Sequence, residues 1–288
     1  LAAVLSTSVA LILVLIKLYA WLITDSTAML ASTTDSVLDL FASIMNVVIL
    51  RFALAPADKN HTFGHGKAES LAGLVQAAFV LGSAILLIFS GVARLVNPQV
   101  ITQSEVAINV TLVSLFLTIS LVFFQRYVIK RTGSLIISGD ALHYQSDLLL
   151  NLGVLAAIIL SQGIWLHADG AFTVFIALYL LIGAGKIILQ SVEQLMDKEL
   201  SDTELEQIRA IVLSHDKAIG VHDLRTRQAG AKRFIQFHLE LADELSLLDA
   251  HSIGEKIEAD IRSALSPCEV FIHHDPTSTV NSEARINS

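Results

Sequence analysis

The sequence predicts a bundle of six transmembrane helices followed by a small α+β domain. The chain of 288 residues is 53% hydrophobic and 16% charged, with a mean hydropathy of +0.64, which is too apolar for an ordinary soluble protein. Acidic residues concentrate after residue 196, where amphipathic and alternating patterns replace the long apolar stretches. We therefore expect a membrane domain over residues 1–200, a soluble domain over residues 201–276 and a disordered tail over residues 277–288.

Six apolar stretches can each cross the hydrocarbon core of a bilayer, which takes about 20 helical residues. They are Ala2–Ile23, Ala28–Leu54, Ala68–Val96, Ser104–Tyr127, Leu135–Ser161 and Ala168–Leu195. The connections after the second and fourth stretches carry Arg51, Lys59, Lys67, Arg126, Lys130 and Arg131, whereas the opposite side has Lys17 and Arg94. Because basic residues favour the cytoplasmic side, we expect both termini to be cytoplasmic. Leu1 lies inside an apolar run, so we expect the natural chain to begin earlier.

The soluble part is expected to have the element order αββαβ. The segment Ser201-Asp202-Thr203-Glu204 has the pattern of a helix start, and apolar residues follow it at helical spacing. Alternating residues predict strands over Val221–Gln228 and Lys232–Leu241, followed by a helix over Leu248–Leu265 and a strand over Glu269–His273. This order indicates helices packed on an antiparallel or mixed sheet, as in a regulatory or assembly domain.

Two of the apolar stretches contain pairs of possible metal ligands four residues apart. Asp35 and Asp39 lie in the second stretch, and His143 and Asp147 lie in the fifth. In a helix each pair occupies one face, about one turn apart. A charged group at membrane depth costs roughly 2.5 to 3.5 kcal/mol on insertion scales, so these groups need a partner. Three carboxylates and one imidazole cannot neutralise one another without protons or a metal, which favours a cation site over simple pairing within the bundle.

The donor atoms of this group suit a divalent cation such as Zn²⁺. Cys268 is the single cysteine, which excludes both an intramolecular disulfide and a site with several thiolates. Four polar residues near the pairs, Ser36, Gln145, Ser146 and Asn151, can either support the ligands or form ordinary hydrogen bonds between helices. The sequence favours neither role.

Two further groups of histidines and acids lie outside the apolar stretches. Asp58, His61 and His65 are spaced by three and four residues in one connection, where they can bind a metal or form a solvated polar loop. The soluble part contains His222, His238, His251, His273, His274 and Asp275. On a strand, His273 and Asp275 share one face while His274 faces the other way. These histidines can hold a metal together or lie separately on the surface.

These features resemble the cation diffusion facilitators, whose members combine six membrane helices, Asp-x-x-x-Asp on the second, His-x-x-x-Asp on the fifth and an αββαβ cytoplasmic domain. The resemblance covers nearly the whole chain. The segment Asn60-His61-Thr62-Phe63-Gly64-His65-Gly66-Lys67-Ala68-Glu69 and the run from Ala141 to Asp147 are most similar to the bacterial zinc and iron efflux pumps of this family.

The resemblance implies a homodimeric metal/proton antiporter in the bacterial inner membrane, with a metallochaperone-like cytoplasmic domain. Its partners are then the lipid bilayer and divalent metal ions such as Zn²⁺, Fe²⁺ or Cd²⁺, with protons as the counter-ion and no nucleic acid. The implied site residues are Asp35, Asp39, His143 and Asp147 for transport, Asp58, His61 and His65 for a loop site, and His222, His238, His251, His273 and Asp275 for a binuclear cytoplasmic site bridged by Asp275. Lys67 and Asp197 correspond to an interlock at the dimer interface, although they can also form a weak surface ion pair. The role of His274 stays open.

The chemistry of the ligands indicates how such a protein can work. Metal binding needs a neutral His143 and ionised carboxylates, so protons and the cation compete for one site, and His143 is the expected proton carrier. The sequence has no G-x-x-x-x-G-K-[ST] motif for ATP, which favours secondary transport by alternating access. An intramembrane metalloenzyme is disfavoured because His-Glu-x-x-His is absent, and a membrane metal sensor is the alternative.

Overall fold

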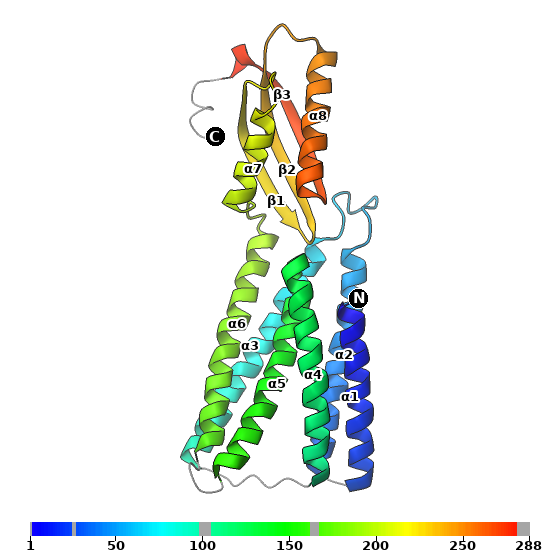
Figure 1. Ribbon diagram of the computed structural model, residues 1–288, viewed down its shortest axis with the longest axis vertical. Helices are drawn as coiled ribbons and strands as arrows, with labels where there is room; N and C mark the ends of the chain where they lie inside the picture. Colours follow the sequence, from blue (N-terminus) through cyan, green and yellow to red (C-terminus); the bar gives the residue numbers. More distant parts are fainter. Residues whose placement is uncertain (1, 25–26, 98–104, 162–166, 281–288) are drawn as a thin grey trace. The chain divides into compact units, whose positions relative to one another are not determined.

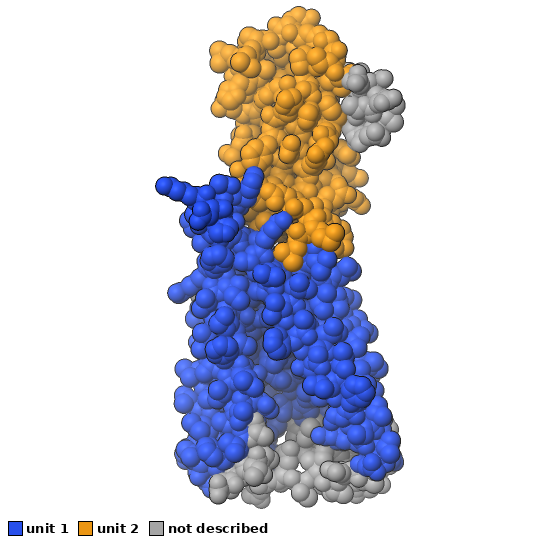
Figure 2. Space-filling model, turned by 180° about the vertical axis from the view of Figure 1, so that it is seen from behind, with its two compact units in different colours: residues 1–192 blue, residues 193–288 orange. Residues whose placement is uncertain are grey.

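The computed structural model describes residues 2–24, 27–97, 105–161 and 167–280 (Figure 1). The chain divides into two compact units, residues 1–192 and residues 193–288 (Figure 2). The first unit is helical, and the second combines two helices with a sheet. This is the fold class that the sequence predicts.

Six helices form the first unit. They are α1 (Ala2–Thr24), α2 (Thr27–Ala53), α3 (Lys67–Val96), α4 (Glu105–Thr132), α5 (Leu135–Ser161) and α6 (Ala168–Leu195). Within the described residues, α1, α2, α3, α4 and α6 each contain a stretch long and apolar enough to cross a membrane. The predicted ends agree closely except for α4, which continues past Tyr127 to Thr132. Hydropathy marks where the apolar residues stop, whereas this helix ends at Gly133, whose φ of 62° an L side chain rarely adopts.

Helix α5 lies at the centre of the packing in the first unit. On one side it joins α3 and α6 in a buried apolar cluster of Ala77, Val80, Ala84, Leu142, Ile176, Leu180, Ala184 and Ile187. On another it joins α1 and α4 through Val9, Leu13, Leu121, Val122 and Tyr144. Small residues such as Ala77, Ala84 and Ala184 let the helix backbones approach closely, as is typical of membrane bundles. Residues on α5 are therefore held from several directions.

The second unit is built on a three-stranded mixed sheet. Its elements are α7 (Asp202–Leu213), β1 (Gly220–Ala229), β2 (Lys232–Leu241), α8 (Leu247–Leu265) and β3 (Cys268–Pro276), in the predicted order αββαβ. The strand order is β1-β2-β3, with β1 antiparallel and β3 parallel to β2. Ile235, Phe237 and Leu239 of β2 pack with Ile208 of α7 and Ile257 of α8 in one apolar core. The alternate residues of β2, including His238, point to the other face of the sheet.

Local features fix the ends of two elements. Ser201 and Glu204 form a capping box at the start of α7, as the sequence predicts. The chain stays ordered beyond the predicted end of the last strand, because β3 reaches Pro276 and a short 3₁₀ helix, η1, covers Thr277–Thr279. Thr277 Oγ1 donates to the Leu241 carbonyl at 3.0 Å, and the Ser278 N–H donates to Asp243 Oδ1 at 3.0 Å. The prediction of a disordered tail from residue 277 is therefore wrong for these first residues, and residues 281–288 lie outside the described part.

Candidate metal sites

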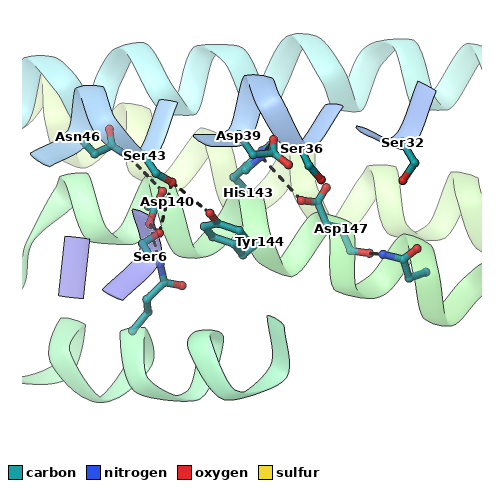
Figure 3. Close-up of polar contacts among 12 residues, drawn as sticks. Ser6, Ser32, Ser36, Asp39, Ser43, Asn46, Asp140, His143, Tyr144 and Asp147 are labelled. Carbon is teal, nitrogen blue, oxygen red and sulfur yellow. Dashed lines mark hydrogen bonds and ion pairs between the residues drawn. The ribbon is translucent and has the colours of Figure 1, made fainter. Parts of the chain in front are cut away.

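The intramembrane group brings together Asp39 of α2 with His143 and Asp147 of α5 (Figure 3). His143 Nε2 lies 2.7 Å from Asp39 Oδ1 and 3.8 Å from Asp147 Oδ2. One ligand atom from each residue lies within 4.8 Å of the other two. Two ligands of a tetrahedral Zn²⁺ at about 2.0 to 2.1 Å would be about 3.4 Å apart. The 2.7 Å contact between His143 and Asp39 is shorter than this spacing and is therefore a hydrogen bond. Asp147 Oδ2, at 3.8 Å from His143 Nε2, is farther away than this spacing.

Asp35, the fourth predicted ligand, lies outside this group. Its side chain is exposed, and it is not among the ligand atoms that lie within 4.8 Å of one another. The next residue, Ser36, is 1% exposed and accepts a hydrogen bond from Lys17 Nζ at 2.8 Å. Helical spacing places Asp35 and Asp39 on one face of α2, but it does not determine how close another helix comes at each position.

The other polar neighbours have different partners. Gln145 Oε1 accepts from Arg126 Nη2 at 2.7 Å and from the Tyr179 hydroxyl at 3.1 Å. Asn151 Nδ2 donates to the backbone carbonyl of Asp147 at 2.8 Å, and this bond does not involve the Asp147 carboxylate. The bonds of Gln145 join α5 to α4 and α6, so Gln145 has the interhelical role that the sequence left open, whereas the bond of Asn151 lies within α5 and matches neither role.

The loop group, Asp58, His61 and His65, is closed by a tight turn between α2 and α3. His61 Nδ1 lies 3.3 Å from Asp58 Oδ1, and His65 Nε2 lies 3.4 Å from Asp58 Oδ2. These distances match the spacing between two ligands of a tetrahedral metal ion. The His61 backbone N–H donates to Asp58 Oδ1 at 2.6 Å, and this bond, more than any other interaction, lowers the pKa of Asp58 below its usual range. The carboxylate is therefore ionised and ready to bind a cation at neutral pH.

The group in the second unit is a row of histidines across the sheet. His222 of β1 pairs with His238 of β2, which pairs in turn with His273 of β3. Opposite residues on neighbouring strands share a face, so the three imidazoles lie side by side on the face away from α7 and α8. The ring centroids are 5.2 Å apart for His222 and His238 and 4.5 Å apart for His238 and His273.

Asp275 lies among these three imidazoles. Asp275 Oδ2 accepts from His238 Nδ1 at 2.7 Å and lies 3.2 Å from His222 Nε2, while Oδ1 lies 3.0 Å from His273 Nε2. Burial tends to raise the pKa of Asp275, but the hydrogen bond from His238 and the nearby imidazoles outweigh it and lower this pKa. One carboxylate with each oxygen on a different histidine has the geometry to bridge two cations.

The remaining predicted residues are not among the converging ligand atoms of these groups. His251 is exposed on α8, where its Nε2 lies 3.5 Å from Glu255 Oε1. His274 faces the other side of the sheet, toward Gly254 of α8, where burial lowers the pKa of its imidazole. Asp197 Oδ1 lies 3.4 Å from Arg227 Nη1, and Lys67 begins α3 in the other unit.

A buried carboxylate that the sequence did not single out is Asp140, one turn before His143 on α5. Its exposure is 7%, and it accepts hydrogen bonds from Ser6 Oγ at 2.6 Å, Asn46 Nδ2 at 3.0 Å and Gln125 Nε2 at 2.7 Å (Figure 3). An acid within a long apolar helix was the available signal. Without a second ligand at the i+4 position it did not match the metal-site pattern.

Known proteins match both units of the chain. Residues 3–196 match the cation efflux transmembrane domain, and residues 200–277 match the cytoplasmic domain of cation efflux proteins. The chain is 44% identical over 284 residues to the cation-efflux pump FieF of Shigella flexneri serotype 5b (strain 8401), covering 99% of this chain and 95% of the relative. The same values hold for the FieF pump of Escherichia coli O1:K1 / APEC.

Among solved structures, the metal-bound C-terminal domain of the CzcD transporter from Thermotoga maritima is 29% identical, with a TM-score of 0.27, over 28% of this chain and 100% of that domain. The match to the transmembrane family covers most of the chain, and the identity to FieF extends over nearly all of it. The chain therefore belongs to the cation efflux family, the cation diffusion facilitators that its motifs resemble.

Proposed function

We propose that this chain is an inner-membrane transporter that exports a divalent cation, foremost Zn²⁺ and also Fe²⁺ or Cd²⁺, in exchange for protons. The observation that carries the proposal is the group of Asp39, His143 and Asp147, whose ligand atoms lie within 4.8 Å of one another between two membrane helices. Two carboxylates balance the charge of a divalent ion, and the neutral imidazole adds a nitrogen ligand without adding charge. Such a site lowers the cost of holding the ion at membrane depth.

Proton exchange follows from the same atoms. The 2.7 Å hydrogen bond between His143 and Asp39 places a proton between two atoms that would both bind the metal. A cation can replace this proton only if the imidazole is neutral and both carboxylates are ionised. When the cation leaves, protons restore the charge balance of a site that would otherwise hold two unpaired carboxylates. The proton gradient across the membrane then drives export.

Alternating access requires this site to open to each side of the membrane in turn. The ligands lie on two separate helices, so a change in the packing of α2 against α5 alters both access and affinity. We propose that the transporter works as a homodimer, with both termini in the cytoplasm. Lys67 and Asp197 keep their proposed role as an interlock between its subunits.

The two outer groups are proposed to bind metal without transporting it. Asp58, His61 and His65 form the loop site, and His222, His238 and His273 form the cytoplasmic site around Asp275, with His251 as a further ligand. Apart from the 2.7 Å hydrogen bond between His238 and Asp275, the contacts between ligands in these groups are 3.0 to 3.4 Å long, which supports the assignment. A Zn²⁺ ion held there would stabilise the cytoplasmic domains and their dimer contacts.

Purified protein in sealed vesicles tests the proposal. Zn²⁺ uptake is followed with an indicator trapped inside vesicles whose lumen is more acidic than the outside. We expect Zn²⁺ to enter as protons leave, and we expect an ionophore that collapses the pH gradient to stop uptake. A membrane metal sensor would bind Zn²⁺ but would move neither ion. Binding without flux in well-folded, dimeric protein would therefore overturn the proposal in favour of the sensor.

A further inference from the structure

Asp140 is an acid at membrane depth whose hydrogen bonds come from neutral donors on three other helices. The donors are Ser6 of α1, Asn46 of α2 and Gln125 of α4, all between 2.6 and 3.0 Å from its oxygens. The exposures of Ser6, Asn46 and Gln125 are 1%, 4% and 0%. Ser6, Asn46 and Gln125 all donate to its oxygens, so the three donors are oriented toward Asp140. Gln76 of α3 donates in turn to Asn46 Oδ1, so five helices meet at this network.

The same network lies next to the transport ligands on both α2 and α5. Along α2 the residues Asp39, Ser43 and Asn46 follow one another at helical spacing. They contact His143, Tyr144 and Asp140 of α5, at 2.7, 3.1 and 3.0 Å respectively (Figure 3). From Asp39 to Asn46 the partner on α5 changes from His143 back to Asp140, as expected for antiparallel neighbours, whereas Ser43 contacts Tyr144 outside that order. These three contacts fix the position of α2 along α5 over about two turns.

We propose that Asp140 is a positioning residue for the transport site, one that holds α2 and α5 in register without touching the transported ion. This inference rests on the function proposed above. The contact between Asn46 and Asp140 keeps Asp39 level with His143, because both contacts join the same two helices. Loss of this contact lets α2 slide or rotate, and the three ligand atoms then no longer converge. Metal ligands need placement to within about 0.5 Å, so a small shift is enough to weaken binding.

A purely structural role for Asp140 predicts a different result. If the network only stabilised the bundle, its loss would lower the amount of folded protein but leave the folded fraction with normal zinc affinity. A positioning role instead changes the KM for Zn²⁺ and the dissociation constant of the transport site in protein that is still folded. Both quantities are therefore measured on monodisperse protein recovered from size-exclusion chromatography.

The test uses Asp140→Asn alone and in combination with Asn46→Asp. Asp140→Asn keeps the size of the side chain but replaces the carboxylate that accepts from three donors by an amide, which has only one acceptor oxygen. The second change moves the carboxylate to α2, where Gln76 already donates, and restores a hydrogen bond between positions 46 and 140. Asp169→Asn is the control, because Asp169 is also an acid bonded across helices, 2.7 Å from Arg94 Nη1 and far in sequence from the α2–α5 contacts.

Zinc affinity is measured by competition with a fluorescent chelator, in protein carrying Asp58→Ala and Asp275→Ala to remove the outer sites. Transport KM is measured in vesicles with the outer sites intact. We expect Asp140→Asn to raise both constants about 10-fold, as is usual when a supporting partner of metal ligands is lost. The double variant should return to within about 3-fold of the parent and Asp169→Asn to within about 2-fold, both below the roughly 10- to 100-fold loss that follows removal of a supporting partner.

Two results would overturn the inference. One is an unchanged affinity and KM in folded Asp140→Asn protein, and the other is a weakened Asp140→Asn protein that the folded double variant fails to restore. If Asp140→Asn does not fold, Asn46→Ala takes its place, because it removes only the α2 partner of Asp140; unchanged affinity there counts equally against the inference. The chelator measurement is independent of flux, so failure of the proposed transport function is distinguishable from failure of this inference.

Discussion

Replacing Asp275 by Ala should remove metal from the cytoplasmic site while leaving the intramembrane site intact. Asp275 contacts all three imidazoles of the row, at 2.7, 3.2 and 3.0 Å, so any ion held by two of these histidines also meets this carboxylate. Structural zinc sites with four ligands bind with about 10 to 16 kcal/mol, or roughly 2.5 to 4 kcal/mol per ligand. At 1.4 kcal/mol for each factor of ten, the loss of one ligand weakens zinc binding roughly 100-fold.

If Asp275 bridges two ions, the substitution removes both. Metal content is measured on the full chain after equilibration with buffered Zn²⁺, and affinity is measured by chelator competition. Asp260→Ala is the matched control, since Asp260 lies in the same unit, 61% exposed and 3.0 Å from the single imidazole of His215. We also expect the Asp275 variant to form a weaker dimer, measured by analytical ultracentrifugation with and without Zn²⁺. Full metal content and unchanged affinity in Asp275→Ala would show that this carboxylate is not a ligand.

The other predictions concern transport and acid stability. Asp39→Ala removes one of the converging ligands and should abolish proton-coupled Zn²⁺ uptake in folded protein, with Asp169→Asn as the control, and undiminished uptake would contradict the site. Zinc affinity of the transport site should fall as the pH drops through the range in which His143 takes up its proton, and His143→Asp should move that midpoint. Equal midpoints in both proteins would make His143 a bystander in proton coupling. Glu204 pairs with Arg233 Nε at 2.9 Å; burial tends to raise its pKa, but bonds from Ser201 and Arg233 outweigh this and lower it. A lowered folded-state pKa contributes stability above the unfolded value of about 4.3 that is lost as the pH falls through the folded value. Glu204→Gln should therefore lower stability at pH 7 by about 0.5 to 1 kcal/mol, and the difference should vanish in acid denaturation profiles once the pH is below the lowered folded-state pKa of Glu204. A constant difference across that range would rule out the ionised pair as its cause.

The sequence predicted the elements well because each one carries its own local signal. Apolar stretches mark helices in the first unit, and alternating residues mark strands in the second. The discrepancies occur where a helix or strand continues beyond the residues whose hydropathy predicted it. Helix α4 continues through Lys130 and Arg131 beyond the apolar stretch, and β3 extends through Asp275 to Pro276 although the sequence there is polar.

Spacing predicted the ligand pairs of the transport site, and their shared chemistry predicted that the two pairs form one group. The structure brings Asp39, His143 and Asp147 together and leaves Asp35 exposed outside this group. The role of Asp140 could not be predicted, because its partners come from three helices and are neutral residues common in membrane bundles. Convergence of this kind depends on tertiary packing, which no local pattern in one chain encodes.

The three groups share the same chemistry but differ in what holds them together, and in the proposed function this difference separates binding from transport. The loop group is closed within one turn by backbone hydrogen bonds to Asp58. The cytoplasmic row is fixed by the strand pairing that places His222, His238 and His273 level with one another. In both groups the backbone that carries the ligands is held locally, by turn hydrogen bonds or by strand pairing.

The intramembrane group is different, because Asp39 and His143 lie on two helices joined at this level by side chains alone. Two helices can shift against each other while each keeps its own backbone hydrogen bonds. This is therefore the group in which a conformational change can alter the affinity for an ion. The contact between Asn46 and Asp140 limits that shift, since it must change whenever α2 moves along α5. Cation binding and helix movement are thus coupled through residues that never touch the cation.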